Sequence, residues 1–235
     1  MPTNYPKSSG TPRSSQHGKA PLPYDRKASV WYVGPRQVIA AILGVLLYGL
    51  LSHVNLIFIM PMSTLDVLLP ALLIPLFFGA VFGPWVGLVV GGFGFLLGDY
   101  VANLWLHDLS WTNGYLFYGS ALINFRDLVG WNTVAGYLIN AMIGLNAGLT
   151  RSTIRRYNTA QALATVGLIC AAGVTVGIAI VVYSAIWLYG SPFYTSREAT
   201  SALFDTVLPN LLLVLVILSL LLWVYDKIYM AKNRA

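Results

Sequence analysis

The sequence predicts an all-α membrane protein, a bundle of six transmembrane helices with an outer lid or interfacial segment. Three observations lead to this fold class. Hydrophobic residues make up 57% of the 235 residues, charged residues make up 9%, and the mean hydropathy is +0.70. Ordinary soluble domains carry roughly 25% charged residues. Apolar stretches of membrane-spanning length recur along the chain, and lysine and arginine gather at alternate ends of these stretches.

Residues 1–30 are expected to form a disordered cytoplasmic tail that precedes a membrane domain covering residues 31–235. The tail is rich in Pro, Ser, Lys and Arg and has no apolar stretch, so it cannot bury enough surface to fold and does not read as a secretory signal. His17 has no Cys or acidic partner at ligand spacing and is interpreted as a solvated residue. The single cysteine, Cys170, excludes an internal disulfide framework.

The membrane domain divides into six apolar spans, since a helix needs about 20 mainly apolar residues to cross the hydrocarbon core. The spans cover approximately residues 36–60, 65–82, 84–106, 128–150, 160–189 and 205–228. The second and third spans meet at Gly83-Pro84 and carry glycines at steps of three or four residues, namely Gly79, Gly83, Gly87, Gly91, Gly94 and Gly98. This spacing keeps the glycines near one helical face, where another helix backbone can approach closely, so a buried packing seam is expected.

The cationic residues orient the spans. Twelve of the fourteen Lys and Arg residues lie before or at the start of the first span, after the fourth, or at or after the end of the sixth, and only Arg126 and Arg197 lie on the other side. By the positive-inside rule both termini are cytoplasmic. The net charge of +6 follows from this topology, so nucleic-acid binding is not predicted.

The segment from 106 to 127 is too short and too polar to span a bilayer. Its sequence WTNGYLFYGSALINF is aromatic and partly apolar, so the segment is expected on the outer surface. Trp and Tyr anchoring at the interface would account for it, and so would a lid over a binding site. The sequence leaves both interpretations open.

No motif for catalysis, metal binding or cofactor binding is present. The chain lacks HExxH, GxSxG and Walker A sequences and has no Cys or His cluster. The glycine-rich GGFGFLLG lies inside an apolar span with no Lys-Ser or Lys-Thr after it, which favours helix packing over phosphate binding. The protein is therefore predicted not to be an enzyme and to need no cofactor or metal.

Polar and aromatic side chains gather at the outer ends of the spans, where they are costly unless they face a cavity or a partner. Asp99 and Asn103 lie one turn apart on the third span, and Asn140 shares a face of the fourth span with glycines. Asn140 fits an interhelical hydrogen bond as well as a ligand contact, and the tryptophans also fit an interfacial aromatic belt. The candidate substrate-binding residues are Asp99, Asn103, Trp111, Asn113, Tyr137 and Asn140.

The order of features in residues 36–100 resembles the substrate-binding S component of energy-coupling factor (ECF) vitamin transporters. An Arg before the first helix is followed by AAILGVLLYGLLS and then by PALLIPLFFGAVFGPWVGLVVGGFGFLLGDY. Beyond residue 130 the similarity consists mainly of size and topology. The resemblance implies a multi-pass protein of a prokaryotic plasma membrane that binds a vitamin or related micronutrient from outside. ATP-driven uptake would then require a transmembrane coupling subunit and two cytoplasmic ATPases.

In that family an Ala-xxx-Ala pattern on the first helix is associated with the coupling interface. The matching place here has Ala40 and Gly44, for which close packing within the chain is an equally good explanation. Ring-stacking residues and amides suit a heterocyclic substrate, and outer residues of both charge signs leave the charge of the substrate open. The alternative function is a ligand-free membrane assembly protein or a small sensor module, and ligand-dependent stabilisation would separate the two.

Overall fold

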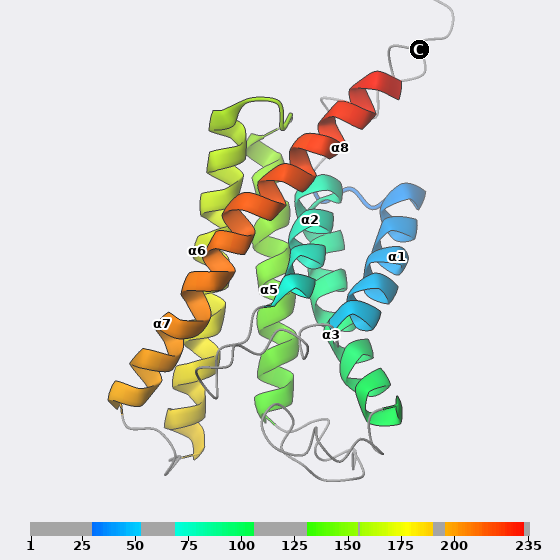
Figure 1. The fold of residues 1–235 in the computed structure, drawn as a ribbon. Coiled ribbons are helices and arrows are strands. Elements are labelled where there is room, and N and C mark those ends of the chain that lie inside the picture. The colour runs from blue at the N-terminus through cyan, green and yellow to red at the C-terminus, as the bar shows by residue number, and fades with distance from the viewer. Residues whose placement is uncertain (1–29, 53–68, 106–130, 155, 190–195, 233–235) are drawn as a thin grey trace, which may run out of the picture.

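The computed structural model describes residues 30–52, 69–105, 131–154, 156–189 and 196–232. Every regular element in these ranges is helical, which confirms the predicted all-α class for them. The elements are α1 (Pro35–Leu51), the 3₁₀ turn η2 (Pro70–Leu72), α2 (Leu73–Phe82), α3 (Pro84–Trp105), α5 (Trp131–Thr153), α6 (Ala160–Tyr189), α7 (Ser196–Leu213), the π-helical segment η4 (Val214–Leu218) and α8 (Ser219–Lys232). The last three form one continuous rod (Figure 1).

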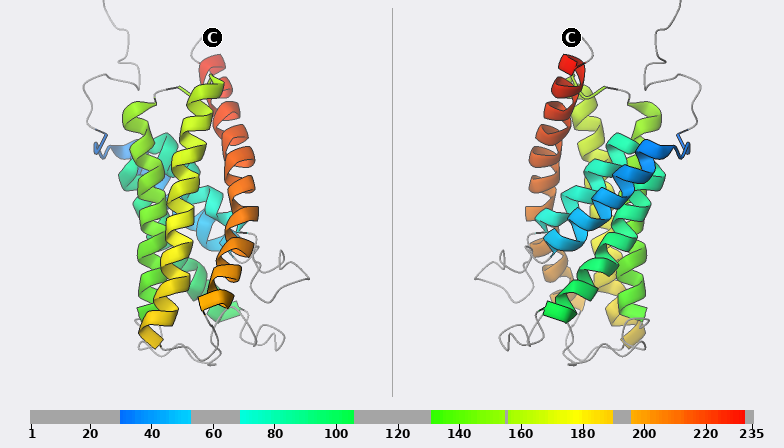
Figure 2. Two further views of the ribbon diagram at one scale, coloured as in Figure 1. Left: turned by 90° about the vertical axis from the view of Figure 1, so that its left-hand side faces the viewer. Right: turned by 90° about the vertical axis from the view of Figure 1, so that its right-hand side faces the viewer.

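α5 and α6 run roughly alongside each other, whereas α1 and the α7–η4–α8 rod are inclined to them (Figures 1 and 2). α5 is central: it contacts α2 and α3 on one side and α6 on the other. α1 packs on α3, and the α7–η4–α8 rod packs mainly on α6. α3 and α5 run in opposite directions, so the end of α3 and the start of α5 lie at the same end of the molecule.

The helix boundaries follow the predicted spans closely in the middle of the chain and differ at the last one. The fifth span, 160–189, coincides with α6, and the third and fourth differ from α3 and α5 by a few residues. The rod begins at Ser196, nine residues before the predicted start at 205. Its first turn carries Arg197 and Glu198, which a criterion based on apolar character leaves out. The predicted spans 36–60 and 65–82 extend into residues 53–68, which lie outside the described residues.

Proline and glycine set the helix starts at one end of the molecule. Pro35 and Pro84 are the first residues of α1 and α3, a position where the missing N–H group costs nothing and φ is already helical. Ahead of α1, the Gly34 N–H donates to Gln37 Oε1 at 3.2 Å. Gly83 joins α2 to α3 with φ of 114°, a left-handed conformation that other residues adopt only with strain.

The glycines of α2 and α3 are buried at two different helix contacts. Gly87 lies against the Gly144 carbonyl and Gly91 against the Asn140 carbonyl, so a Cβ at either position would overlap the backbone of α5. Gly94 instead lies under the Tyr48 ring of α1. The predicted buried packing seam is therefore confirmed, and the structure divides it between α5 and α1.

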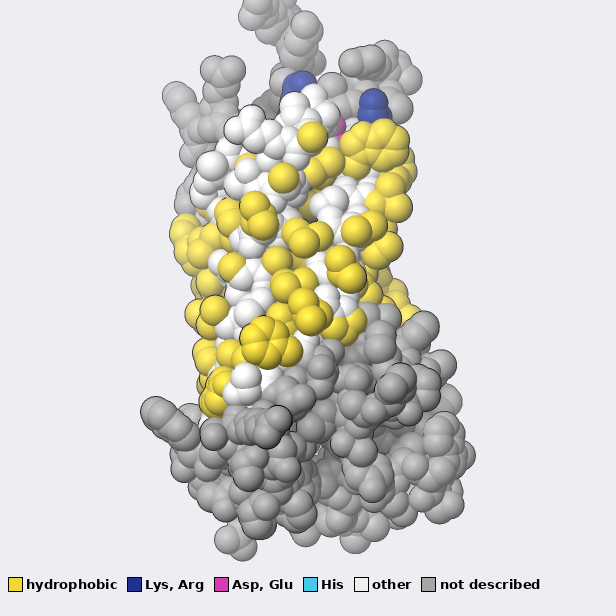
Figure 3. All heavy atoms as spheres, turned by 60° about the vertical axis from the view of Figure 1, so that its left-hand side comes forward, with side chains coloured by type: hydrophobic (Ala, Val, Ile, Leu, Met, Phe, Trp, Pro, Cys, Tyr) yellow, Lys and Arg dark blue, Asp and Glu magenta, His cyan; other side chains and the backbone are white. Residues whose placement is uncertain are grey.

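The outer surface of the bundle is strongly apolar (Figure 3). Ala160–Ile180 and Thr206–Tyr229, with 21 and 24 residues, are long and apolar enough to cross a membrane. Only 33% and 28% of their most apolar stretches are buried against the rest of the protein, unlike the mostly buried core helices of soluble domains. Residues Pro35–Leu51, Pro70–Phe82 and Pro84–Gly98 form shorter apolar helices.

Candidate functional site

The predicted substrate-binding residues that lie on described helices range from one end of the bundle to its middle. Asp99 and Asn103 lie on the last two turns of α3, and Tyr137 and Asn140 lie on the first half of α5. The antiparallel packing of α3 and α5 therefore brings the last turns of α3 and the first turns of α5 to the same end (Figure 1), with Asn140 nearer the middle of the bundle. Trp111 and Asn113, with the whole predicted lid at 106–127, lie outside the described residues.

Asn140 joins α5 to α1 through its side chain. Its Oδ1 accepts a 2.8 Å hydrogen bond from the Tyr48 hydroxyl, and its Nδ2 donates to the Gly136 carbonyl at 2.9 Å. Tyr48 is only 2% exposed, so this bond lies deep in the bundle. Of the two interpretations of Asn140, the interhelical hydrogen bond accounts for its position in the structure.

Aromatic rings surround the Tyr48–Asn140 hydrogen bond. The Phe95 ring of α3 lies between Tyr48 and Tyr137, with ring centroids 6.4 Å and 5.8 Å away. Gly94 leaves room for the Tyr48 ring against α3. Tyr48, Phe95, Tyr137 and Asn140 thus form one cluster, called the aromatic-amide cluster below. The cluster contains aromatic rings and an amide, the kinds of group that bind planar heterocycles.

Sequence reasoning missed Tyr48 and Phe95. Tyr48 is a residue with a polar hydroxyl inside the apolar run ILGVLLYGLLS, and a polar group inside such a run needs a partner. That signal could have identified it. Phe95 carries no such signal, because one phenylalanine in GGFGFLLG looks like the other.

Two further asparagines fasten helices together. Asn210 is 1% exposed, accepts the Leu69 N–H at 2.8 Å and donates to the Thr206 carbonyl at 2.8 Å. Asn146 on α5 donates to the Ile169 carbonyl of α6 at 2.9 Å. Amides inside the bundle are therefore used for helix–helix contacts as well as near the candidate site.

Ala40 and Gly44, the predicted coupling-interface pair, are buried inside the chain. Ala40 is 5% exposed, and a Cβ at Gly44 would meet the side chains of Val90 and Phe78. Packing of α1 on α2 and α3, the alternative that the sequence left open, accounts for both small residues. The face of α1 that points outward is aliphatic and includes Ile39 and Leu43.

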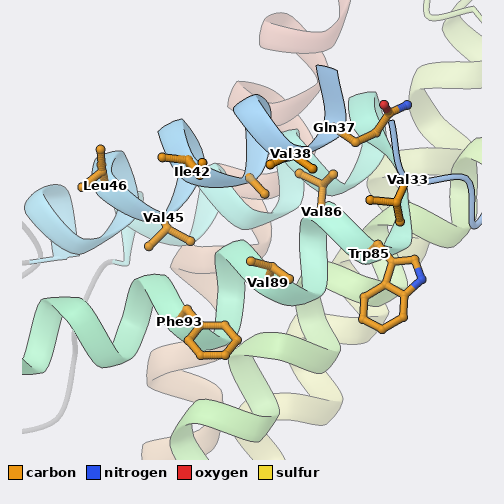
Figure 4. A pocket seen from close by; sticks show the side chains of 11 residues that line it. Val33, Gln37, Val38, Ile42, Val45, Leu46, Trp85, Val86, Val89 and Phe93 are labelled. Atoms are coloured by element: carbon orange, nitrogen blue, oxygen red, sulfur yellow. The ribbon is translucent and has the colours of Figure 1, made fainter. Parts of the chain in front are cut away.

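A groove of about 420 Å³ lies between α1 and α3 (Figure 4), and its lining includes no residue of the aromatic-amide cluster. It begins where both helices begin and continues along them to Leu46 and Phe93. One lining residue is polar, Gln37, and its amide lies at the end of the groove with the heteroatoms turned away from the apolar lining (Figure 4). The lining residues are Val33, Gln37, Val38, Ala41, Ile42, Val45, Leu46, Trp85, Val86, Val89 and Phe93.

Most of the described cations lie at one end of the bundle, and the exception is Arg197 in the first turn of α7, at the other end. Arg36 is in the first turn of α1, Arg151 is in the last turn of α5, Arg156 precedes α6, and Lys227 is near the end of α8. These four positions share one end of the bundle (Figure 1). An Nη of Arg151 donates to the Phe82 carbonyl, which fixes its guanidinium beside the α2–α3 turn.

Within the described ranges no three His, Cys, Asp or Glu side chains lie close enough to hold a metal ion. Comparisons of the chain with protein-family models, curated proteins and solved structures found no match.

Proposed function

We propose that this protein is the substrate-binding S component of an ECF-type importer in a prokaryotic plasma membrane. It would bind a vitamin or related micronutrient from outside and deliver it to a transmembrane coupling subunit driven by two cytoplasmic ATPases. The chain itself would perform no catalysis. The proposal rests on the sequence resemblance together with three properties of the described residues.

The first property is the apolar exterior, which supports a multi-pass membrane protein of six helices. Exposed side chains such as Leu168, Val176, Leu212 and Val216 cover α6 and the α7–η4–α8 rod. Water would penalise this surface at about 25 cal/mol per Å² of apolar area, whereas lipid tails accept it. Most of the surface of the two longest apolar helices therefore fits a lipid environment better than an aqueous one.

The second property is the separation of charge, which supports cytoplasmic termini. Arg36, Arg151, Arg156 and Lys227 occupy one end of the bundle, the end from which α1 starts and at which α8 finishes. The positive-inside rule assigns this end to the cytoplasm. The aromatic-amide cluster then lies toward the outer face, where a substrate would arrive.

The third property is the aromatic-amide cluster itself, and it is the observation that carries the binding proposal. Tyr48, Phe95, Tyr137 and Asn140 bring polar groups and ring edges together inside a bundle that is otherwise mainly apolar. Asp99 lies one turn beyond Phe95 toward the outer end. We propose that this cluster forms the floor of the substrate site, and that Asp99, Asn103, Trp111 and Asn113 complete it under the lid formed by residues 106–127.

A ligand screen tests this proposal. The purified protein in mild detergent is heated with single B vitamins and their precursors, because a ligand that binds only the folded state raises the unfolding temperature by mass action. One compound should raise the unfolding temperature in a dose-dependent manner. At 100 times its Kd it should add about 2.7 kcal/mol to the free energy of unfolding. Asn103→Ala should weaken this effect, whereas Arg156→Ala, at the opposite end, should not. Stabilisation by none of the compounds would contradict the proposal.

One observation favours a second candidate, a ligand-free membrane assembly protein or small sensor module. The amides of Asn140, Asn146 and Asn210 all make hydrogen bonds that hold elements of this chain together. Under this alternative the polar interior serves assembly alone. Affinity purification from native membranes separates the two: recovery of a coupling subunit with two ATPases supports the importer, and recovery of an unrelated membrane complex supports the alternative.

A further inference from the structure

The groove between α1 and α3 is separate from the proposed substrate site, and its lining suits hydrocarbon. Along its length the side chains are aliphatic or aromatic, from Val38 and Val86 near one end to Leu46 and Phe93 near the other (Figure 4). Ile42 and Phe93 are 56% and 60% exposed, so the groove opens sideways and not toward either end of the bundle. A polar solute would find almost no hydrogen-bonding group there.

The dimensions of the groove fit a flexible chain better than a helix. From Gln37 to Leu46 it follows α1 for about 14 Å at 1.5 Å per residue. Its 420 Å³ then correspond to a mean cross-section of roughly 30 Å² over that length. A helix about 10 Å across needs roughly 80 Å². A lipid acyl chain therefore fills the groove where a partner helix would only lie over it.

One end of the groove has the side chains expected at a lipid headgroup. The Trp31 and Trp85 rings meet edge to face there, with centroids 6.3 Å apart, and Trp is the residue that favours the membrane interface. Gln37 lies at the same end. The polar end of the groove and its apolar length thus follow the order of a phospholipid from headgroup to tail.

The same end is electrostatically positive. α1 and α3 both begin there, with Pro35 and Pro84 as first residues, and helix N-termini carry partial positive charge. Arg36 is exposed in the first turn of α1, and the Arg151 guanidinium is held beside the α2–α3 turn. Two arginines and two helix N-termini complement an anionic headgroup.

We propose that the α1–α3 groove binds one acyl chain of an anionic phospholipid of the cytoplasmic leaflet, with the lipid phosphate near Arg36. This site rests on the membrane orientation in the proposed function and is independent of the vitamin-like substrate. It gives α1 a bound lipid along the flank that adjoins its outward aliphatic face.

Native mass spectrometry of protein from mild detergent, after exchange with phosphatidylglycerol or phosphatidylcholine, tests the acyl-chain part. The wild type should retain one phosphatidylglycerol. Ala41→Phe places a ring in the groove and should abolish retention, whereas Ala164→Phe on the exposed side of α6 should leave it unchanged. Equal retention by both variants would overturn the assignment. If Ala41→Phe does not fold, a photoactivatable acyl chain on the wild type decides: crosslinks at Ile42 and Val89 support the site, and crosslinks spread over all exposed helices overturn it.

Removing one positive charge tests whether the anionic headgroup binds near Arg36. Arg36→Gln should lower the preference for phosphatidylglycerol over phosphatidylcholine about fivefold, the effect of one arginine at an anionic surface. Arg156 is exposed at the same end but precedes α6, which packs on α5 and the α7–η4–α8 rod, so Arg156→Gln should keep the preference. No change with Arg36→Gln would remove the headgroup assignment. In native membranes, a crosslink from the groove to a polypeptide in place of lipid would also overturn the proposal. The vitamin screen measures a different ligand, so the lipid-binding proposal and the vitamin-binding proposal can each fail without the other.

Discussion

The contact of Gly87 in α3 with Gly144 in α5 gives a quantitative prediction for Gly87→Ala. A methyl group at this position would overlap the carbonyl oxygen and carbon of Gly144 and would come within 2.8 Å of the Gly79 Cα. All three are backbone atoms, so no side-chain rotation can relieve the overlap. α3 would have to move away from α5, along the seam that joins the two halves of the bundle.

The expected net effect is a loss of stability. Overpacking of this kind costs about 1–3 kcal/mol, and replacing helical glycine by alanine returns at most about 1 kcal/mol. With the full gain subtracted, the net loss is up to about 2 kcal/mol, which should lower the unfolding temperature by up to about 8 °C for a chain of this size. Gly87→Leu adds three further carbons at the same contact and should reduce both yield and stability more.

Gly136→Ala is the matched control, because it adds the same methyl group to a glycine in a helix. The nearest atom to that methyl is Phe95 Cε1 at 3.4 Å, an ordinary contact with a side chain. This variant should be as stable as the wild type or more stable, since only the gain in helix propensity remains. Thermal unfolding of the wild type, Gly87→Ala and Gly136→Ala in the same detergent measures the effect. Equal stability of Gly87→Ala and Gly136→Ala would show that α3 and α5 do not approach as closely as described.

Three further predictions concern the aromatic-amide cluster, the orientation and the lid. Tyr48→Phe removes the donor to Asn140 and should cost about 0.5–1.5 kcal/mol in thermal unfolding, within the usual range for such bonds; unchanged stability would mean that this bond contributes nothing. With single cysteines placed at Ser14 or Thr112, an impermeant thiol reagent on intact cells should label only Thr112→Cys, and the reverse pattern would invert the topology. Once a ligand is known, Trp111→Ala should weaken binding in titration calorimetry by about 1–3 kcal/mol, and wild-type affinity would place the site elsewhere.

Patterns that depend on backbone geometry were readable from the sequence. The run of glycines at steps of three or four predicted a buried seam, because a missing Cβ matters only where another backbone is close. Gly83-Pro84 predicted the break between two helices, which the positive φ of Gly83 now explains. The start of the rod at Ser196 was missed because its first turn is polar, and apolar span length says nothing about a helix that continues past the apolar stretch.

The candidate site was less readable, because it depends on which side chains from distant spans meet. Asn140 could be singled out as a polar group in an apolar span, but its partner Tyr48 is 92 residues away in the chain. Ala40 and Gly44 also show that the sequence does not identify the partner in a contact. Their spacing predicted close packing correctly, yet small residues look the same whether the neighbour is within the chain or on another subunit.

The π-helical segment Val214–Leu218 has a consequence for the shape of the last helix. The buried positions along the rod recur every four residues from Asn210 through Val214, Leu218 and Leu222 to Asp226. In a regular α-helix each such step overshoots a full turn by about 40°, so the buried stripe would wind around the rod and leave its neighbours. A wider π turn takes up part of this excess. One helix can therefore keep a nearly straight seam against its neighbours from Asn210 to Asp226, and a single inserted or deleted residue at 214–218 would change the pitch of that stripe before it broke the helix.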